Sequence, residues 1–265
     1  MLNENKTQLN ENNNTKLNII LILTALIFFV YFTFLNYLQQ FHFLVYWDNL
    51  YYQKLFKILI KAHKTNYLYL SAFDNKNLFF DHLYFTSIIY LPFYLIKQNY
   101  FTLHIIQNFL IISAGFVLYQ IARKIFNISK ILAISIFICF LLHPTIQGNM
   151  YNTINTTNLT ILFGSLIFYF YYTNNKFWYI FFNFCFILTR EDLGLIIILL
   201  NIIFLIICYK KKEIKYISNA FIFLGIIIFA VVYSGLAIIW ILPNLQTNDI
   251  QHLHFQKYYG YLGNS

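Results

Sequence analysis

A single carboxylate among aromatic side chains is the first feature of the sequence that could do chemistry. Asp48 stands in the segment YWDNLYY, residues 46–52, shortly after a long apolar stretch. A carboxylate near the membrane boundary, with its pKa raised by desolvation, can act as a general base. Asp48 equally suits the N-cap of a helix over 49–63 in an aromatic belt. The residue types leave both interpretations open.

An acidic residue and a histidine stand together further along the chain. Asp81 and His82 precede an apolar run at 83–96, and Asp74 lies seven residues before Asp81. A carboxylate and an imidazole can hold a divalent ion, but one such pair is a weak metal signal. A hydrogen-bonded pair at the start of a helix is the favoured alternative.

An uncharged loop rich in amides and hydroxyls covers residues 143–158 between two apolar runs. It includes Asn152 and Asn155, together with several threonines. Neutral donors and acceptors suit the hydroxyl groups of a sugar. Asn and Thr are also common in ordinary connecting loops, so both interpretations stay open.

A short charged turn, residues 189–194, joins two other apolar runs with almost no spare length. Its charges must therefore lie at or just inside the membrane rim. Arg190 can bind a lipid phosphate through its two-pronged guanidinium. The alternative is an internal ion pair of Arg190 with Glu191 or Asp192 that anchors the turn.

The composition indicates which class of protein must hold these residues in place. Of the 265 residues, 60% are hydrophobic and 10% are charged, which excludes a soluble globular enzyme. The net charge of +9 is spread between apolar runs, so nucleic acid is not an expected partner. A stripe of lysines in the expected helix 49–63 indicates contact with lipid headgroups: Lys54, Lys57, Lys61 and Lys64. The three cysteines show no metal or disulfide spacing.

The expected fold is an all-α integral membrane protein of about seven transmembrane helices. The apolar runs lie at about 17–37, 101–121, 131–144, 159–173, 177–189, 193–209 and 219–242. Residues 1–16 are expected to be a disordered cytoplasmic tail, 17–242 the transmembrane domain, and 243–265 a tail on the outer face.

The run 83–96 decides the topology. Counting Lys and Arg alone favours a topology in which this run crosses the membrane. If it lies at the surface instead, most of the acidic residues and histidines gather on the outer face, which is what a site at the membrane surface needs. His104 is the one histidine that does not obviously belong to that outer rim.

Six short pieces spread along nearly the whole chain carry a resemblance. They are Trp47–Asp48, Asp81–Phe85, Ala122–Lys124, Leu142–Gln147, Arg190–Gly194 and Tyr258–Gly263. In this order they resemble a family of bacterial multipass membrane proteins known as domain of unknown function 2079, itself similar to the GT-C glycosyltransferases. Those enzymes use lipid-phosphate-linked sugars as donors.

The resemblance implies a first outer loop over 38–100 with surface helices, so that 83–96 does not cross. It implies an inner-membrane protein with a cytoplasmic N-terminus. Asp48 matches the catalytic carboxylate and Arg190 a residue for the lipid phosphate, while Asp81 and His82 would line the same outer cavity. The expected activity is therefore sugar transfer from a polyprenyl-phosphate donor to an acceptor at the outer face.

The sequence also departs from the family pattern. No further acidic residue follows Asp48 closely, so a metal cofactor has no support from the residues, and the cofactor stays unknown. Relatives usually continue beyond the point where this sequence ends, which suggests a truncated copy. The alternatives are a non-catalytic carrier or flippase component for lipid-linked sugars and an inactive fragment. The oligomeric state, the sugar and the acceptor are not indicated.

Overall fold

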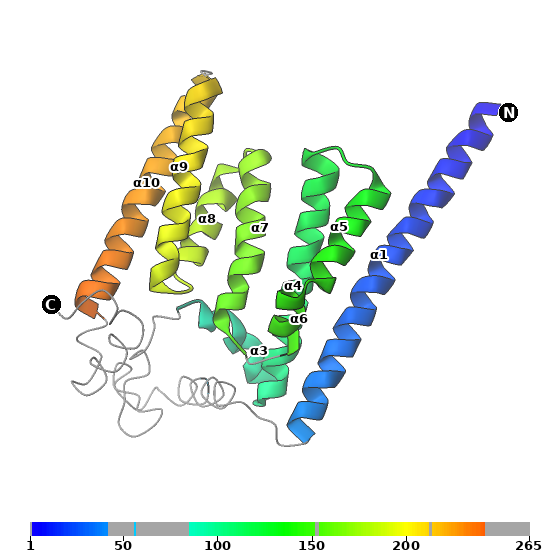
Figure 1. Cartoon of the computed structure of the whole chain (residues 1–265), viewed down its shortest axis with the longest axis horizontal. Coiled ribbons are helices and arrows are strands. Elements are labelled where there is room, and N and C mark those ends of the chain that lie inside the picture. The colour runs from blue at the N-terminus through cyan, green and yellow to red at the C-terminus, as the bar shows by residue number, and fades with distance from the viewer. Residues whose placement is uncertain (1, 42–55, 57–84, 152–153, 212–213, 242–265) are drawn as a thin grey trace. The chain divides into compact units, whose positions relative to one another are not determined.

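The computed structural model describes residues 2–41, 56, 85–151, 154–211 and 214–241. Every regular element in these ranges is a helix (Figure 1), which confirms the all-α class. The chain divides into two compact units. The first unit comprises residues 1–49 and 99–179, and the second comprises 50–98 and 180–265. Each unit is described by itself.

The long helix α1, Leu2–Phe41, opens the first unit. Its apolar part, Thr15–Gln39, is long enough to cross a membrane. The helix begins well before the apolar run, and no Gly or Pro in the preceding polar residues prevents this. The segment expected to be a disordered tail is thus helical from Leu2 onward.

Helix α4, Tyr100–Gln120, is central to the first unit and packs against α1, α5 and α7. The side chain of Asn99 caps it by accepting a hydrogen bond from the N–H of Phe101 at 3.1 Å. A π-helical turn, Ile121–Ile125, ends it. Gly115 lets the next helix approach closely, because a Cβ there would lie 2.9 Å from the Phe137 ring.

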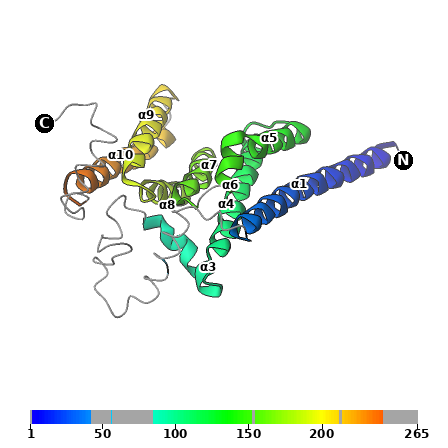
Figure 2. The ribbon, with the colours of Figure 1, turned by 60° about the horizontal axis from the view of Figure 1, so that its bottom comes forward.

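Helices α5, Lys130–Leu142, and α6, Pro144–Tyr151, form a pair bent by 55°. The bend falls at His143, where Pro144 cannot continue the helical hydrogen bonds. Helix α6 packs against α1, α4 and α5 (Figure 2). The apolar core of the unit joins these helices through buried side chains that include Leu21, Phe32, Ile111, Phe137, Leu141 and Met150.

The 3₁₀ turn Thr156–Asn158 leads into α7, Leu159–Tyr172, and α8 follows at Lys176–Ile187. Between α7 and α8, Asn174 adopts φ 57°, a left-handed conformation that Asn tolerates better than most residues. Helix α8 begins in the first unit and ends in the second.

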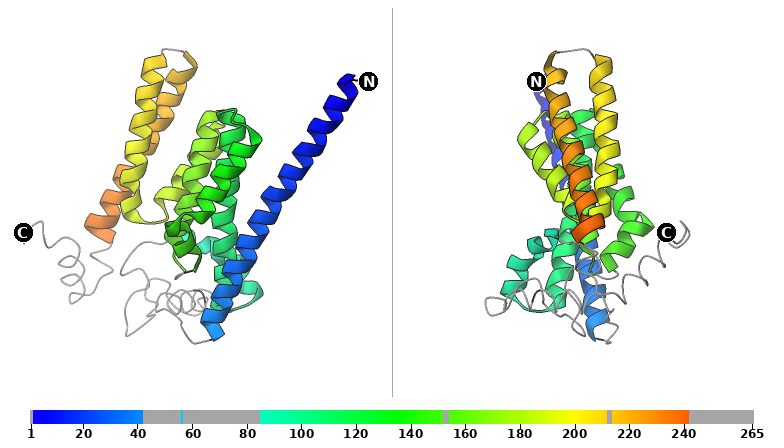
Figure 3. Two further views of the ribbon diagram at one scale, coloured as in Figure 1. Left: turned by 45° about the vertical axis from the view of Figure 1, so that its right-hand side comes forward. Right: turned by 90° about the vertical axis from the view of Figure 1, so that its left-hand side faces the viewer.

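The second unit contains α9, Gly194–Lys211, and α10, Ile214–Leu236, which lie side by side (Figure 3). The 3₁₀ turn Glu191–Leu193 precedes α9, and the π-helical turn Ala237–Ile241 extends α10. A 3₁₀ helix, Phe85–Tyr90, continues into the short helix α3, Leu91–Ile96. The described residues of these two, Phe85–Ile96, form an apolar stretch shorter than a membrane span, and the expectation that 83–96 does not cross stays a prediction.

Four of the described helices are long and apolar enough to cross a membrane, and the bent pair α5 and α6 makes up to five. The apolar parts are those of α1, α4, α9 and α10. Helices α7 and α8 coincide with two further predicted runs, but they have 14 and 12 residues. A multipass membrane architecture is therefore confirmed, while the described helices of spanning length are fewer than the seven expected.

Candidate functional site

The buried, uncharged polar side chains of the first unit gather at one end. This polar end comprises the last turns of α1, the first turns of α4, helix α6 and the start of α7 (Figure 1). At this end Asn36 on α1 is fully buried, and its Nδ2 donates to the carbonyl oxygen of Met150 at 2.9 Å. This hydrogen bond links α1 to α6.

Gln107 on α4 holds the amide-rich loop in place. Its Nε2 donates to the carbonyl oxygen of Asn149 at 2.7 Å, and its Oε1 accepts from the N–H of Asn155 at 3.0 Å. Gln107 is fully buried. One side chain therefore satisfies backbone groups on both sides of the loop, which would otherwise be costly to bury.

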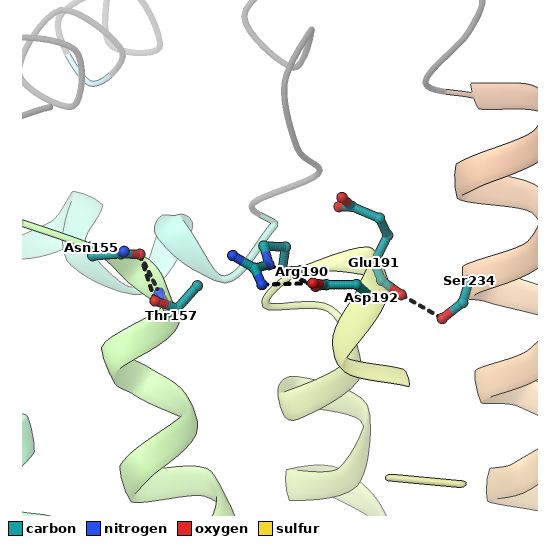
Figure 4. A network of polar contacts seen from close by, with 6 residues as sticks. All are labelled: Asn155, Thr157, Arg190, Glu191, Asp192 and Ser234. Atoms are coloured by element: carbon teal, nitrogen blue, oxygen red, sulfur yellow. Dashed lines mark hydrogen bonds and ion pairs between the residues drawn. The ribbon is translucent and has the colours of Figure 1, made fainter. Parts of the chain in front are cut away.

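Asn155, one of the residues predicted to bind a sugar, caps the turn before α7. Its Oδ1 accepts hydrogen bonds from the N–H of Thr157 at 2.9 Å and from the Oγ1 of Thr157 at 2.7 Å (Figure 4). The structure thus gives Asn155 the role of an ordinary loop residue, which was one of the two interpretations. Contact with a sugar stays a prediction.

Three buried polar residues on α4 were not among the predicted site residues. Tyr100, His104 and Asn108 are 7%, 1% and 0% exposed. Their spacing of four residues places them along one side of the helix. The signal was present in the sequence, since polar residues four apart interrupt an apolar run and His104 already stood out. Their burial against other helices could not be deduced from it.

The charged turn between α8 and α9 lies in the second unit. Arg190 has an extended backbone, and its Nε and Nη2 atoms donate to the two carboxylate oxygens of Asp192, each at 2.6 Å (Figure 4). The side chains of Arg190 and Asp192 are 30% and 42% exposed. The internal ion pair considered from the sequence is therefore formed, with Asp192 as the partner.

The next residue fastens the same turn to α10. Glu191 is buried at 4% exposure, and its carbonyl oxygen accepts a hydrogen bond from Ser234 Oγ at 2.5 Å. A Cβ at Gly194 would collide with the same Ser234 Oγ, so the first residue of α9 has no room for a side chain. The turn that carries Arg190 is thus held by close packing as well as by a hydrogen bond.

Four predicted site residues, Asp48, Asp81, His82 and Asn152, lie outside the described residues. Of the two that are described, Asn155 belongs to the first unit and Arg190 to the second. Within the described part of the chain, no group of three His, Cys, Asp or Glu side chains could hold a metal ion.

Basic residues of the first unit collect at the end away from the amide loop. Arg123 and Lys124 follow α4, Lys130 begins α5, and Lys176 begins α8. The end of α4 and the start of α5 meet there, at the end of the unit where α1 begins (Figure 1).

These features define an α-helical multipass membrane protein with polar turns at the helix ends. A family model described as "Predicted membrane protein (DUF2079)" matches residues 63–265, and the chain belongs to this family. The matched range includes Asp81, His82, Asn155 and Arg190, whereas Asp48 precedes it. No curated protein and no solved structure matches the chain.

Proposed function

We propose that the protein is a membrane glycosyltransferase of the GT-C class, which transfers a sugar from a polyprenyl-phosphate donor to an acceptor at the outer face of the membrane. One observation carries the proposal. Arg190 lies in a turn between two apolar helices with its guanidinium partly exposed and oriented by Asp192. A cation in that place suits the phosphate of a lipid-linked substrate.

The Arg190 turn has the chemistry that a phosphate requires. A guanidinium binds phosphate through two parallel hydrogen bonds, as it binds the Asp192 carboxylate here. The Arg190 and Asp192 pair is partly exposed, so its exchange for a phosphate costs little. The turn also leads into the N-terminus of α9, where the helix dipole stabilises an anion.

In the proposed reaction the Asp48 carboxylate takes the proton of an acceptor hydroxyl. The hydroxyl oxygen attacks the anomeric carbon of the donor, and the bond between that carbon and the phosphate oxygen breaks. The electron pair of this bond leaves with the polyprenyl phosphate, which Arg190 holds. A positioned general base contributes about 10² to 10⁴ in rate.

The proposal requires the amide loop and the Arg190 turn to open on the same side of the membrane. Helices α7 and α8 separate the two segments along the chain. If these two helices form a hairpin, the chain returns to the side from which it started. The basic residues lie at the other end of the first unit, away from the amide loop, and they support a cytoplasmic location for that end.

The test is a transfer assay on the full chain in lipid nanodiscs. The donors are farnesyl phosphates that carry glucose, mannose or arabinose, and release of farnesyl phosphate is measured. We expect turnover in the wild-type protein, a loss of about 10² to 10⁴ in Asp48→Asn, and a loss of about 10- to 100-fold in Arg190→Ala. Arg123→Ala is the matched control, because Arg123 contacts the Ile128 carbonyl oxygen in the connection after α4.

The outcomes separate the proposal from its alternatives. Full activity in Asp48→Asn would contradict the role of Asp48. Binding of the donors without release of farnesyl phosphate would indicate a carrier, because a carrier uses Arg190 but breaks no bond. A protein that neither binds nor turns over any donor would be a non-catalytic fragment.

A further inference from the structure

A row of buried polar side chains on α4 lacks hydrogen-bond partners among the described residues. Tyr100, His104 and Asn108 follow one another at intervals of four residues on the first three turns of the helix. All three side chains are more than nine-tenths buried. We call these three residues the α4 stripe.

The polar atoms of the α4 stripe find no hydrogen-bond partner among the described residues. These atoms are both ring nitrogens of His104, both amide atoms of Asn108 and the hydroxyl of Tyr100. Gln107, on the same turns, uses both ends of its amide for loop contacts. The lack of partners is thus a property of the stripe and not of every polar group on α4.

Burying these polar side chains is unfavourable unless their donors and acceptors find hydrogen-bond partners. In a membrane there is no bulk water to complete a buried donor or acceptor, so polar side chains inside a bundle normally bond to one another or mark a functional path. The stripe holds three such residues in succession. Its polar atoms are therefore available to a bound molecule.

The chemistry of the stripe indicates an uncharged, hydroxyl-rich group. An amide, an imidazole and a phenol provide both donors and acceptors, and the rings of Tyr100 and His104 meet edge to face at 5.9 Å. Among the described buried side chains of the first unit there is no carboxylate, lysine or arginine. A sugar fits this combination of aromatic surface and neutral polar groups, whereas a phosphate requires cations.

The distance over which the stripe extends along α4 also suits a bound sugar. Tyr100 is the first residue of α4, and Asn108 lies about 12 Å further along the helix axis. We infer that Tyr100, His104 and Asn108 contact the sugar of the lipid-linked donor. This inference rests on the proposed function and adds a sugar-binding surface to it.

The experiment measures thermal unfolding of the full chain in lipid nanodiscs with farnesyl phosphate and with farnesyl phosphates that carry glucose, mannose or arabinose. For wild-type protein we expect at least one glycosylated probe to raise the Tm more than farnesyl phosphate does. Asn108→Leu should raise the Tm without any probe, because an apolar side chain replaces an unpartnered amide. The same variant should lose the additional increase caused by the sugar, with the Kd of that probe raised about tenfold or more.

Asn201→Leu is the matched control. Asn201 is equally buried, but its Nδ2 bonds to Asn183 and to the Ile197 carbonyl oxygen. This control should lower the Tm and keep the additional increase. His104→Phe provides an independent second test, and it should also lose the additional increase.

Three results would overturn the inference while the proposed function stands. One is an additional increase that persists in Asn108→Leu and His104→Phe. Another is a wild-type protein that responds equally to farnesyl phosphate and to every glycosylated probe. The third is a lower Tm of Asn108→Leu without probe, because the amide would then already have partners. A wild-type protein that responds to no probe contradicts the proposed function as well.

Discussion

Asn108 on α4 and Asn201 on α9 are both fully buried, but they differ in what surrounds them. Asn201 donates to Asn183 at 3.2 Å and to the Ile197 carbonyl oxygen at 2.8 Å, so the second unit itself provides hydrogen-bond partners for this side chain. Asn108 has no hydrogen-bond partner in the described part of the chain. Asn201 thus stabilises the fold of the second unit, whereas Asn108 stays available for binding in the first.

The largest effect is expected where the second unit is packed most closely. Gly194→Leu places a side chain where Ser234 Oγ already lies, so the free energy of unfolding should fall by about 3 kcal/mol. Gly225→Leu is the matched control, because a Cβ there meets nothing within 4 Å. Chemical denaturation in nanodiscs measures both variants. Equal stability of the two would contradict the close packing between α9 and α10.

A smaller loss is expected when the asparagine pair of the second unit is broken. Asn201→Leu leaves Asn183 buried without that partner, at a cost of about 1–2 kcal/mol. Replacing both residues by Leu should recover most of the loss, because no polar group then stays unpaired. Additive losses in the double variant would show that the two amides act independently.

The first unit offers a comparable test at Gln107. Gln107→Leu removes the partner of the Asn149 carbonyl oxygen and of the Asn155 N–H, so unfolding should become easier by about 1 kcal/mol. Gln120→Leu, at the other end of α4, is the control and should change little. Chemical denaturation measures both variants. A Gln107→Leu variant that is more stable than the wild-type protein would contradict the stabilising role of these two hydrogen bonds.

The smallest change in stability is expected at the exposed ion pair. Asp192→Asn should alter the free energy of unfolding by less than about 1 kcal/mol. It should strengthen binding of farnesyl phosphate about two- to fivefold, because a competing carboxylate is removed from Arg190. Titration with farnesyl phosphate measures this effect, and weaker binding would show that Asp192 is needed to orient the guanidinium.

The sequence predicts much of the architecture. Its apolar runs at 101–121, 193–209 and 219–242 coincide closely with α4, α9 and α10, because hydrophobic length alone determines such helices. It does not predict that α1 begins at Leu2, since a polar segment without Gly or Pro is compatible with both helix and coil. The runs at 159–173 and 177–189 are almost as short as α7 and α8, so their lengths agree with the structure although each run is predicted to be a span.

The candidate site was predictable where its contacts are local. The pairing of Arg190 with Asp192 joins residues two apart and was among the alternatives. For Asn155 the alternative was an ordinary loop role, and its contact with Thr157 is equally local. Gln107 contacts residues 42 and 48 positions away, and no local pattern indicates such partners. His104 stood out in the sequence, but its burial and its lack of partners depend on how α4 packs.

The most direct test of the account is the sidedness of the two units. Single cysteines at Thr145, Ser129, Asp192 and Lys210, in a variant without Cys139, Cys185 and Cys208, can be probed in intact cells with a membrane-impermeant thiol reagent. The account predicts labelling at positions 145 and 192 and protection at 129 and 210. Labelling at 145 together with protection at 192 would place the amide loop and the Arg190 turn on opposite sides, and would contradict a shared site for the lipid-linked sugar.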